Sequence, residues 1–125
     1  MTTGFYWDER CFWHHGGNFA STMPVGGLVQ PMVGGLPENP ETKRRLRNLI
    51  DVTGLIHDLS PRRAGPVGRT EMERVHPAAY LDRFKALSDA GGGDMGLRAP
   101  FGPGGFEVAA VSAGLATQAL RDVLS

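Results

Sequence analysis

Residues 39–59, NPETKRRLRNLIDVTGLIHDL, constrain the fold more than any other part of the chain, because they carry a complete set of helix signals. Asn39 is a good N-cap, and Pro40 suits the first helical position, where a missing N–H costs nothing. Gly54 suits the left-handed residue that ends a helix. The sequence therefore predicts a helix over 40–53. Its apolar stripe is formed by Leu46, Leu49, Ile50 and Thr53.

Two strands and two long loops are predicted around this helix. Residues 3–7 are rich in aromatic and β-branched side chains and predict a first strand, and residues 60–64 predict a second. Residues 11–37 and 94–105 have no clean period and contain much of the chain's glycine. The first of these loops has enough aromatic side chains to pack down, so we expect it to be ordered.

Three further helices are predicted downstream. Thr70 and Glu73 match the capping-box pattern and predict a short helix that starts at Thr70. Pro77 opens a second helix that runs through Leu87, before a run of three glycines ends it. The last helix is predicted over 106–124.

The last predicted helix is apolar on more than one face, which indicates burial on several sides. With 125 residues the chain is expected to form a single unit, yet little in it could surround such a helix. We therefore expect residues 1–125 to be the N-terminal portion of one larger domain, with part of the apolar surface left bare.

Composition excludes several classes of protein. Lys plus Arg and Asp plus Glu both number 13, so nothing favours general binding to nucleic acid or to an anionic membrane. No apolar run is long enough to span a bilayer. The single cysteine, Cys11, excludes a disulfide framework within the chain and suits a reducing compartment. The N-terminus lacks the positive region of a signal peptide, so a cytoplasmic location is expected.

Four segments, taken in order, carry a resemblance to a known family. They are FYWDE at 5–9, NPETKRR at 39–45, ERVHPAAYL at 73–81, and GGGDMG at 91–96 followed by FEVAAVSAGLATQAL. Together they resemble the histone deacetylase and acetylpolyamine amidohydrolase family, in particular the bacterial histone-deacetylase-like amidohydrolases. Family members more usually open the second segment with His-Pro-Glu, and here Asn39 stands in place of that histidine.

The resemblance implies an α/β fold: the N-terminal part of the three-layer arginase/deacetylase architecture, with a mostly parallel sheet and flanking helices. It also implies zinc-dependent hydrolysis of N-acetyl amides on lysine or polyamines in the whole protein. The family's zinc ligands and catalytic histidine pair lie in segments such as Pro-Pro-Gly-His-His, which do not occur here. For this chain we therefore expect no catalytic residue, no metal ligand and no cofactor.

Four residues are candidates for binding roles that the resemblance implies. Asp94 matches an aspartate at the mouth of the substrate tunnel, and the alternative is a loop carboxylate that caps a turn. Trp13 and Phe19 are candidates for the tunnel rim, and simple loop packing is the alternative. Arg45 matches an arginine that lines an internal channel, and the alternative is a solvated helix face.

The adjacent histidines His14 and His15 are interpreted as loop residues without a metal role, because no Cys or carboxylate cluster accompanies them. Two hypotheses about function remain. The chain is either an incomplete deacetylase-type amidohydrolase without activity of its own, or a short non-catalytic binding module that keeps only the loops of the substrate rim. Association with a second copy or another chain through the exposed apolar face is a further expectation.

Overall fold

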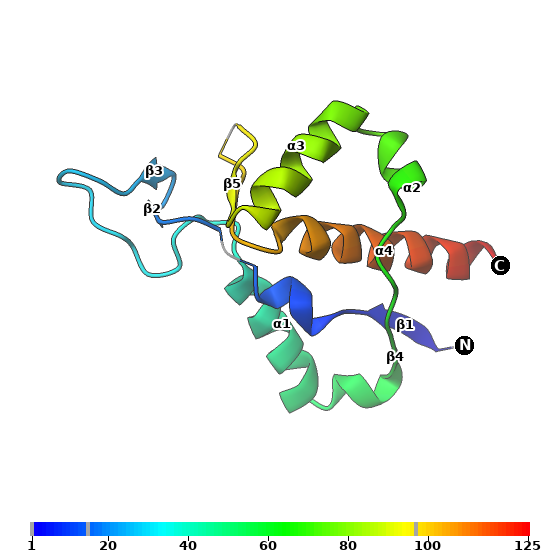
Figure 1. The fold of residues 1–125 in the computed structure, drawn as a ribbon. Helices are drawn as coiled ribbons and strands as arrows, with labels where there is room; N and C mark the ends of the chain where they lie inside the picture. The colour runs from blue at the N-terminus through cyan, green and yellow to red at the C-terminus, as the bar shows by residue number, and fades with distance from the viewer. Residues whose placement is uncertain (1, 15, 97) are drawn as a thin grey trace.

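The computed structural model describes residues 2–14, 16–96 and 98–125 (Figure 1). The helices in these ranges are α1 (Pro40–Val52), α2 (Arg69–Glu73), α3 (Ala78–Asp89) and α4 (Gly105–Leu124), with short 3₁₀ helices at Glu9–Phe12 and Leu55–Asp58. The strands are β1 (Thr3–Tyr6), β2 (Phe19–Ala20), β3 (Met23–Pro24), β4 (Leu59–Arg62), β5 (Gly93–Asp94) and β6 (Pro100–Phe101).

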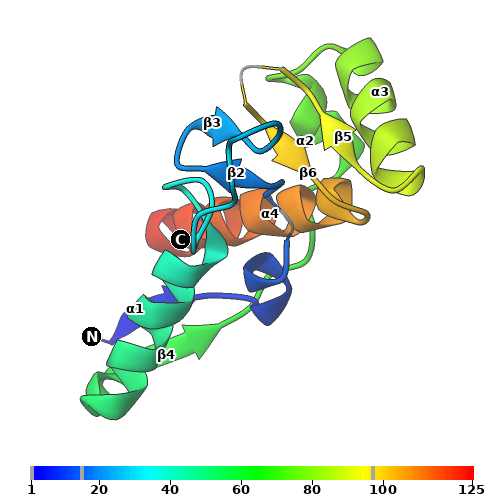
Figure 2. The same ribbon diagram turned by 90° about the vertical axis from the view of Figure 1, so that its left-hand side faces the viewer.

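The two predicted strands, β1 and β4, pair in parallel, with Thr3 opposite Leu59 and Tyr6 opposite Arg62. The backbone N–H of Trp7 extends the pairing by donating to the Arg62 carbonyl at 3.2 Å. Parallel strands need a long crossover, and α1 lies within the crossover between β1 and β4 (Figure 2). This β1–α1–β4 unit with its flanking helices confirms the predicted α/β class.

Helix α1 has the predicted ends. The Asn39 side chain accepts a hydrogen bond from the Glu41 N–H at 3.0 Å, and Gly54 has the left-handed φ of 79°. The predicted apolar stripe, however, is mostly uncovered. Ile50 is buried, whereas Leu46 and Leu49 are 57% and 56% exposed.

The predicted capping box of the short helix is wrong. Helix α2 begins at Arg69 with Gly68 as its N-cap, and no side chain caps it. Thr70 is therefore already inside the helix. Glu73 pairs instead with Arg69, whose Nε lies 2.6 Å from the carboxylate. This i, i+4 ion pair needs Arg69 inside the helix, which moves the start one residue upstream of the sequence-based expectation.

Helix α4 begins within a residue of its predicted start and is anchored over its N-terminal half. The Ser88 hydroxyl, from the end of α3, accepts a hydrogen bond from the Phe106 N–H at 3.1 Å and so caps α4 from another helix. Further along, the Val67 N–H donates to the Ala110 carbonyl at 3.0 Å. The chain passes so close to α4 that a Cβ on Gly114 would lie 1.9 Å from the Gly65 carbonyl oxygen.

Both predicted loops contain a short hairpin that the sequence did not reveal: β2 pairs with β3, and β5 with β6. Paired segments of two residues are too short to show a period of two. The β2–β3 loop projects from the rest of the chain as an arm (Figure 1). Phe19 is buried at its base, while Leu28 and Val33 are fully exposed.

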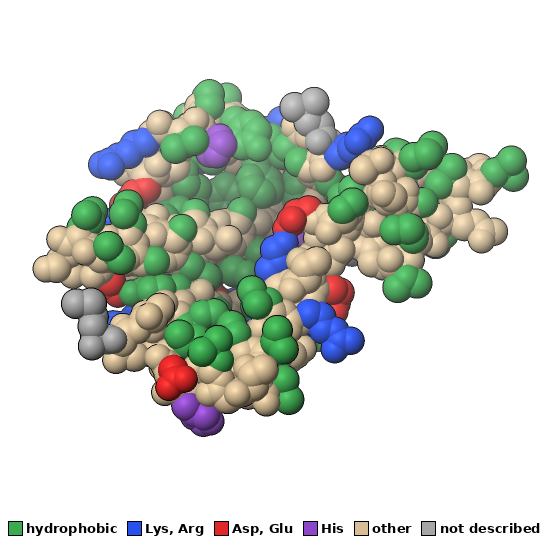
Figure 3. Space-filling model, turned by 180° about the vertical axis from the view of Figure 1, so that it is seen from behind, with side chains coloured by type: hydrophobic (Ala, Val, Ile, Leu, Met, Phe, Trp, Pro, Cys, Tyr) green, Lys and Arg blue, Asp and Glu red, His purple; other side chains and the backbone are tan. Residues whose placement is uncertain are grey.

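The buried apolar core is small for a chain of this length: Phe19, Ile50, Leu81, Ala110 and Val111. The accessible surface is 8555 Å². A compact monomer of 13.4 kDa would expose roughly 6500 Å². The C-terminal half of α4 contributes to the excess, with Leu120, Val123 and Leu124 between 59% and 82% exposed. The expected bare apolar surface is therefore present, and Figure 3 shows apolar side chains across one face.

No helix in the described ranges combines the length and hydropathy that a bilayer-spanning segment requires.

Candidate functional site

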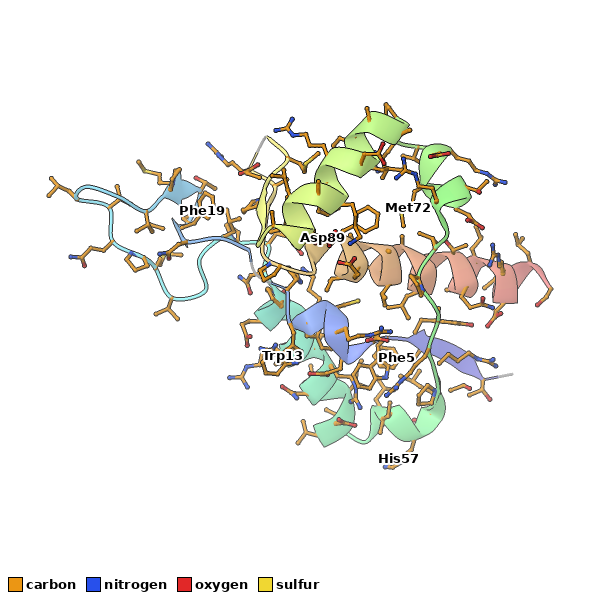
Figure 4. The ribbon with its side chains drawn as sticks, viewed as in Figure 1. Phe5, Trp13, Phe19, His57, Met72 and Asp89 are labelled. Carbon is orange, nitrogen blue, oxygen red and sulfur yellow. The ribbon has the colours of Figure 1, made fainter. Side chains whose placement is uncertain are left out.

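A groove of about 590 Å³ runs beside β1 and is bordered by α1 and α4. We call it the β1 groove. Its lining includes Phe5, which is labelled beside β1 in Figure 4, together with Tyr6, Trp7 and Asp8. Most of the remaining lining is apolar: Phe12, Leu46, Phe84, Phe101, Val108 and Leu115. The β1 groove is therefore the candidate binding surface considered below.

Arg47 is one of the charged residues that line the β1 groove, together with Asp8, Glu38 and Lys43. Its guanidinium lies 4.7 Å from the centre of the Trp7 ring, and it forms an ion pair with Asp51 one turn along α1. The side chain is only 18% exposed. No acceptor among the described residues takes a hydrogen bond from its buried Nε. A buried donor of this kind is costly, so Arg47 is suited to binding an oxygen atom that enters the groove.

Asp8 is a buried carboxylate that accepts hydrogen bonds from Arg10, two residues along the chain. Arg10 donates to the two Asp8 oxygens from Nε at 2.9 Å and from Nη2 at 2.7 Å. These bonds outweigh the opposing effect of burial and lower the pKa of Asp8 from 3.8 to about 2. A carboxylate that stays ionised and doubly bonded is a poor general base near neutral pH. Asp8 is therefore a structural anion that shapes the groove.

Cys11 lines the same groove and is half-buried. Burial raises the pKa of its thiol, and its Sγ lies 4.0 Å from the Val108 carbonyl oxygen. A raised pKa leaves little thiolate, which is the nucleophilic form. Cys11 is therefore a poor nucleophile in this environment.

Asp94 lies in β5 at the turn of the β5–β6 hairpin, and it is exposed. Its Oδ1 accepts a hydrogen bond from the Gly96 N–H at 2.6 Å. The turn-capping role weighed from the sequence is therefore present in the structure. The role in substrate binding stays a prediction, for which an exposed carboxylate is suitably placed.

Of the other predicted binding residues, Trp13 and Phe19 lie apart from one another in Figure 4. Trp13 is 75% exposed, donates from Nε1 to Glu9 at 3.0 Å, and lies under the Arg44 guanidinium. Phe19 is buried in the arm, so it serves loop packing there. Arg45 is exposed and does not line the β1 groove.

Arg47, two residues on from Arg45, lines the groove instead, and sequence reasoning missed it. The only sequence signal for it is the acidic partner Asp51 four residues on, a spacing that is also common on solvated helix faces.

No group of three His, Cys, Asp or Glu side chains able to hold a metal ion occurs in residues 2–14, 16–96 and 98–125. The ring of His14 is exposed, with its Nδ1 2.9 Å from the Cys11 carbonyl oxygen. His15, the other member of the tandem pair, lies outside the described residues.

The fold is shared with a histone deacetylase domain. The chain superposes on the crystal structure of the HDA15 HD domain with a TM-score of 0.77 and 21% sequence identity, covering 98% of this chain and 32% of that one. The architecture is therefore part of the arginase/deacetylase fold, as predicted.

Sequence comparison gives the closer relationship. The chain is 56% identical over 124 residues to a histone deacetylase-like amidohydrolase of Pseudomonas aeruginosa. This match confirms the resemblance noted in the sequence: the chain is related to histone deacetylase-like amidohydrolases over 98% of its length. It spans about a third of the length of that curated relative. No family model matches the chain.

Proposed function

We propose that this chain forms the N-terminal third of a zinc-dependent amidohydrolase that hydrolyses N-acetyl amides of lysine or polyamines. The observation that carries the proposal is the 56% identity to the Pseudomonas aeruginosa relative over almost the whole chain. The uncovered apolar surface and the shared fold support it, because both are expected of one part of a larger domain. In this proposal the chain builds a wall and part of the rim of the site.

The described residues do not suit a zinc site, since no three potential ligands come together. The proposal therefore places the metal ligands in the part of the relative that this chain does not match. Zinc, when bound there, would polarise the amide and activate water. The proposed contribution of this chain is to orient the substrate and to exclude water from one side of the site. The cytoplasmic location expected from the sequence stays a prediction.

Asp94 is the residue proposed to touch the substrate. An exposed carboxylate can accept N–H groups from a peptide backbone and so fix its orientation. This needs no change in the backbone of the hairpin, because the Gly96 N–H already holds one carboxylate oxygen in place.

The test is made in a chimera in which this chain replaces the matching third of the Pseudomonas aeruginosa relative. Asp94→Ala should raise KM for an acetyl-lysine peptide about 10- to 100-fold, as expected for loss of a hydrogen bond to a charged group. The exposed Asp58→Ala is the matched control and should leave KM unchanged. Equal kinetics for both variants would reject the binding role of Asp94.

A further inference from the structure

Arg98, in the turn of the β5–β6 hairpin, has a strained backbone. Its φ is 63°, and Ser21 is the only other described residue that has a positive φ without being glycine. A side chain as large as arginine rarely adopts this left-handed conformation, because its Cβ crowds the backbone. The turn holds it there: the Ala99 N–H donates to the Gly96 carbonyl at 3.2 Å, and the Met95 N–H donates to the Ala99 carbonyl at 3.2 Å. Backbone strain of this kind is concentrated at sites of binding and catalysis.

The side chain of Arg98 is exposed and has no partner. No described residue forms an ion pair with its guanidinium or accepts a hydrogen bond from it. Arg44 and Arg69, by contrast, each pair with a carboxylate on their own helix. An unpaired guanidinium is suited to a carboxylate from another molecule, because its planar fork of N–H donors matches the two carboxylate oxygens.

The β5–β6 hairpin, which stands beside α3 in Figure 2, carries Arg98 to the rim of the β1 groove. Met95 and Ala99, which directly follow Asp94 and Arg98, both line the groove. Asp94 lies opposite Pro100 in the hairpin register, and Pro100 is two residues from Arg98. Two residues of an extended chain span about 7 Å. A short extended peptide can therefore reach both Asp94 and Arg98.

The other charges around the groove are matched. Among the described residues, each charged side chain of the lining pairs with one of opposite sign. These pairs are Asp8 with Arg10, Glu38 with Lys43, and Arg47 with Asp51. Asp94 and Arg98 add one charge of each sign at the rim. This part of the rim thus offers no surplus of negative charge to a polyamine, whose amines are protonated near neutral pH.

We propose that Arg98 selects acetyl-lysine peptides that carry an aspartate or glutamate close to the acetyl-lysine, and that it disfavours acetylated polyamines. The proposal rests on the proposed function and names the substrate class of that same site. Asp94 accepts N–H groups of the peptide backbone, and the Arg98 guanidinium donates to the side-chain carboxylate of the peptide. A polyamine instead brings positive charge toward a guanidinium that no described residue neutralises.

The test uses the chimera and three substrates: an acetyl-lysine peptide with glutamate beside the acetyl-lysine, the same peptide with glutamine in that place, and N-acetylspermidine. At low ionic strength the glutamate peptide should have a kcat/KM about two- to fivefold above that of the glutamine peptide, which is the size expected of an exposed ion pair. The ratio should fall toward one at high salt, because exposed charges are screened there.

Two variants of Arg98 separate its charge from its effect on the turn. Arg98→Glu should reverse the preference between the peptides and raise kcat/KM for N-acetylspermidine about two- to fivefold. Arg98→Gly removes the guanidinium and suits the left-handed φ, so it should abolish the preference without lowering the Tm of the chimera. Arg83→Glu is the matched control, because Arg83 is exposed on α3 and does not line the β1 groove. It should leave the preference unchanged.

The outcomes distinguish this inference from the proposed function. An unchanged glutamate preference in Arg98→Glu, or an equal change in Arg83→Glu, would overturn the role of Arg98. Turnover of both peptides at equal kcat/KM by the unmodified chimera would overturn it as well, and would leave the proposed function in place. Absence of turnover with all three substrates contradicts the proposed function, and the role of Arg98 is then rejected with it.

Discussion

At the scale of single residues, Gly114 lies where the backbone of the chain passes close to helix α4. A Cβ at this position would lie 1.9 Å from a backbone oxygen of Gly65, which cannot move aside as a flexible side chain can. We expect Gly114→Ala to lower the free energy of unfolding by about 3 kcal/mol or more, measured by urea denaturation. Gly65→Ala is the control, because nothing lies within 4 Å of its added Cβ. Equal effects would contradict this packing.

Asp8 gives a residue-scale prediction about pH. Its folded pKa of about 2 lies below the ordinary 3.8, so its contribution to stability is present above pH 3.8 and is lost as pH falls through about 2. Arg10→Gln removes the charged donor and should move the titration midpoint of Asp8 upward. The measurement is an NMR titration of the Asp8 carboxyl carbon. An ordinary midpoint in the unmodified chain would contradict the structure.

Residue-scale features of the site were the hardest to predict from sequence. Two examples are the hydrogen bonds from Arg10 to Asp8 and the contact of the Arg47 guanidinium with the Trp7 ring. Both depend on the side-chain conformation and not only on the residue type. Ser88 caps a helix 17 residues downstream of it, which no local pattern indicates. Local propensity carries no information about such long-range contacts.

At the scale of elements, helix ends were predictable wherever the signal was local and uncontested. Asn39 and Gly54 cap α1 as expected. Thr70 failed as an N-cap because Arg69, just before it, gains an ion pair by joining the helix. The hairpins at β2–β3 and β5–β6 were missed because their paired segments are only two residues long.

The contrast between these caps can be measured. Asn39→Ala removes the acceptor of the Glu41 N–H and should cost about 1 kcal/mol of unfolding free energy. Thr70→Ala should change it by less than about 0.5 kcal/mol, because the Thr70 hydroxyl is not a cap. Urea denaturation of both variants provides the measurement. If Thr70→Ala lowers the free energy of unfolding more than Asn39→Ala does, the capping box predicted at Thr70 is present after all.

At the scale of the whole molecule, the C-terminal half of α4 presents uncovered apolar side chains on the surface. Leu120 and Val123 are apolar yet exposed, which is costly for a chain acting alone. We expect the isolated chain to bind a hydrophobic dye such as ANS. The double variant Leu120→Glu, Val123→Glu should bind less dye, and the Tm of the isolated chain should not fall. In the chimera the same pair should lower Tm, because these positions are then covered. If the double variant leaves the Tm of the chimera unchanged, Leu120 and Val123 stay exposed to solvent there, which contradicts this expectation.

The most direct test of the account compares zinc content and hydrolysis of an acetyl-lysine peptide between the isolated chain and the chimera with the Pseudomonas aeruginosa relative. We expect bound zinc and turnover in the chimera, and neither in the isolated chain. Turnover by the isolated chain, or a folded chimera that holds zinc but does not hydrolyse the peptide, would contradict it.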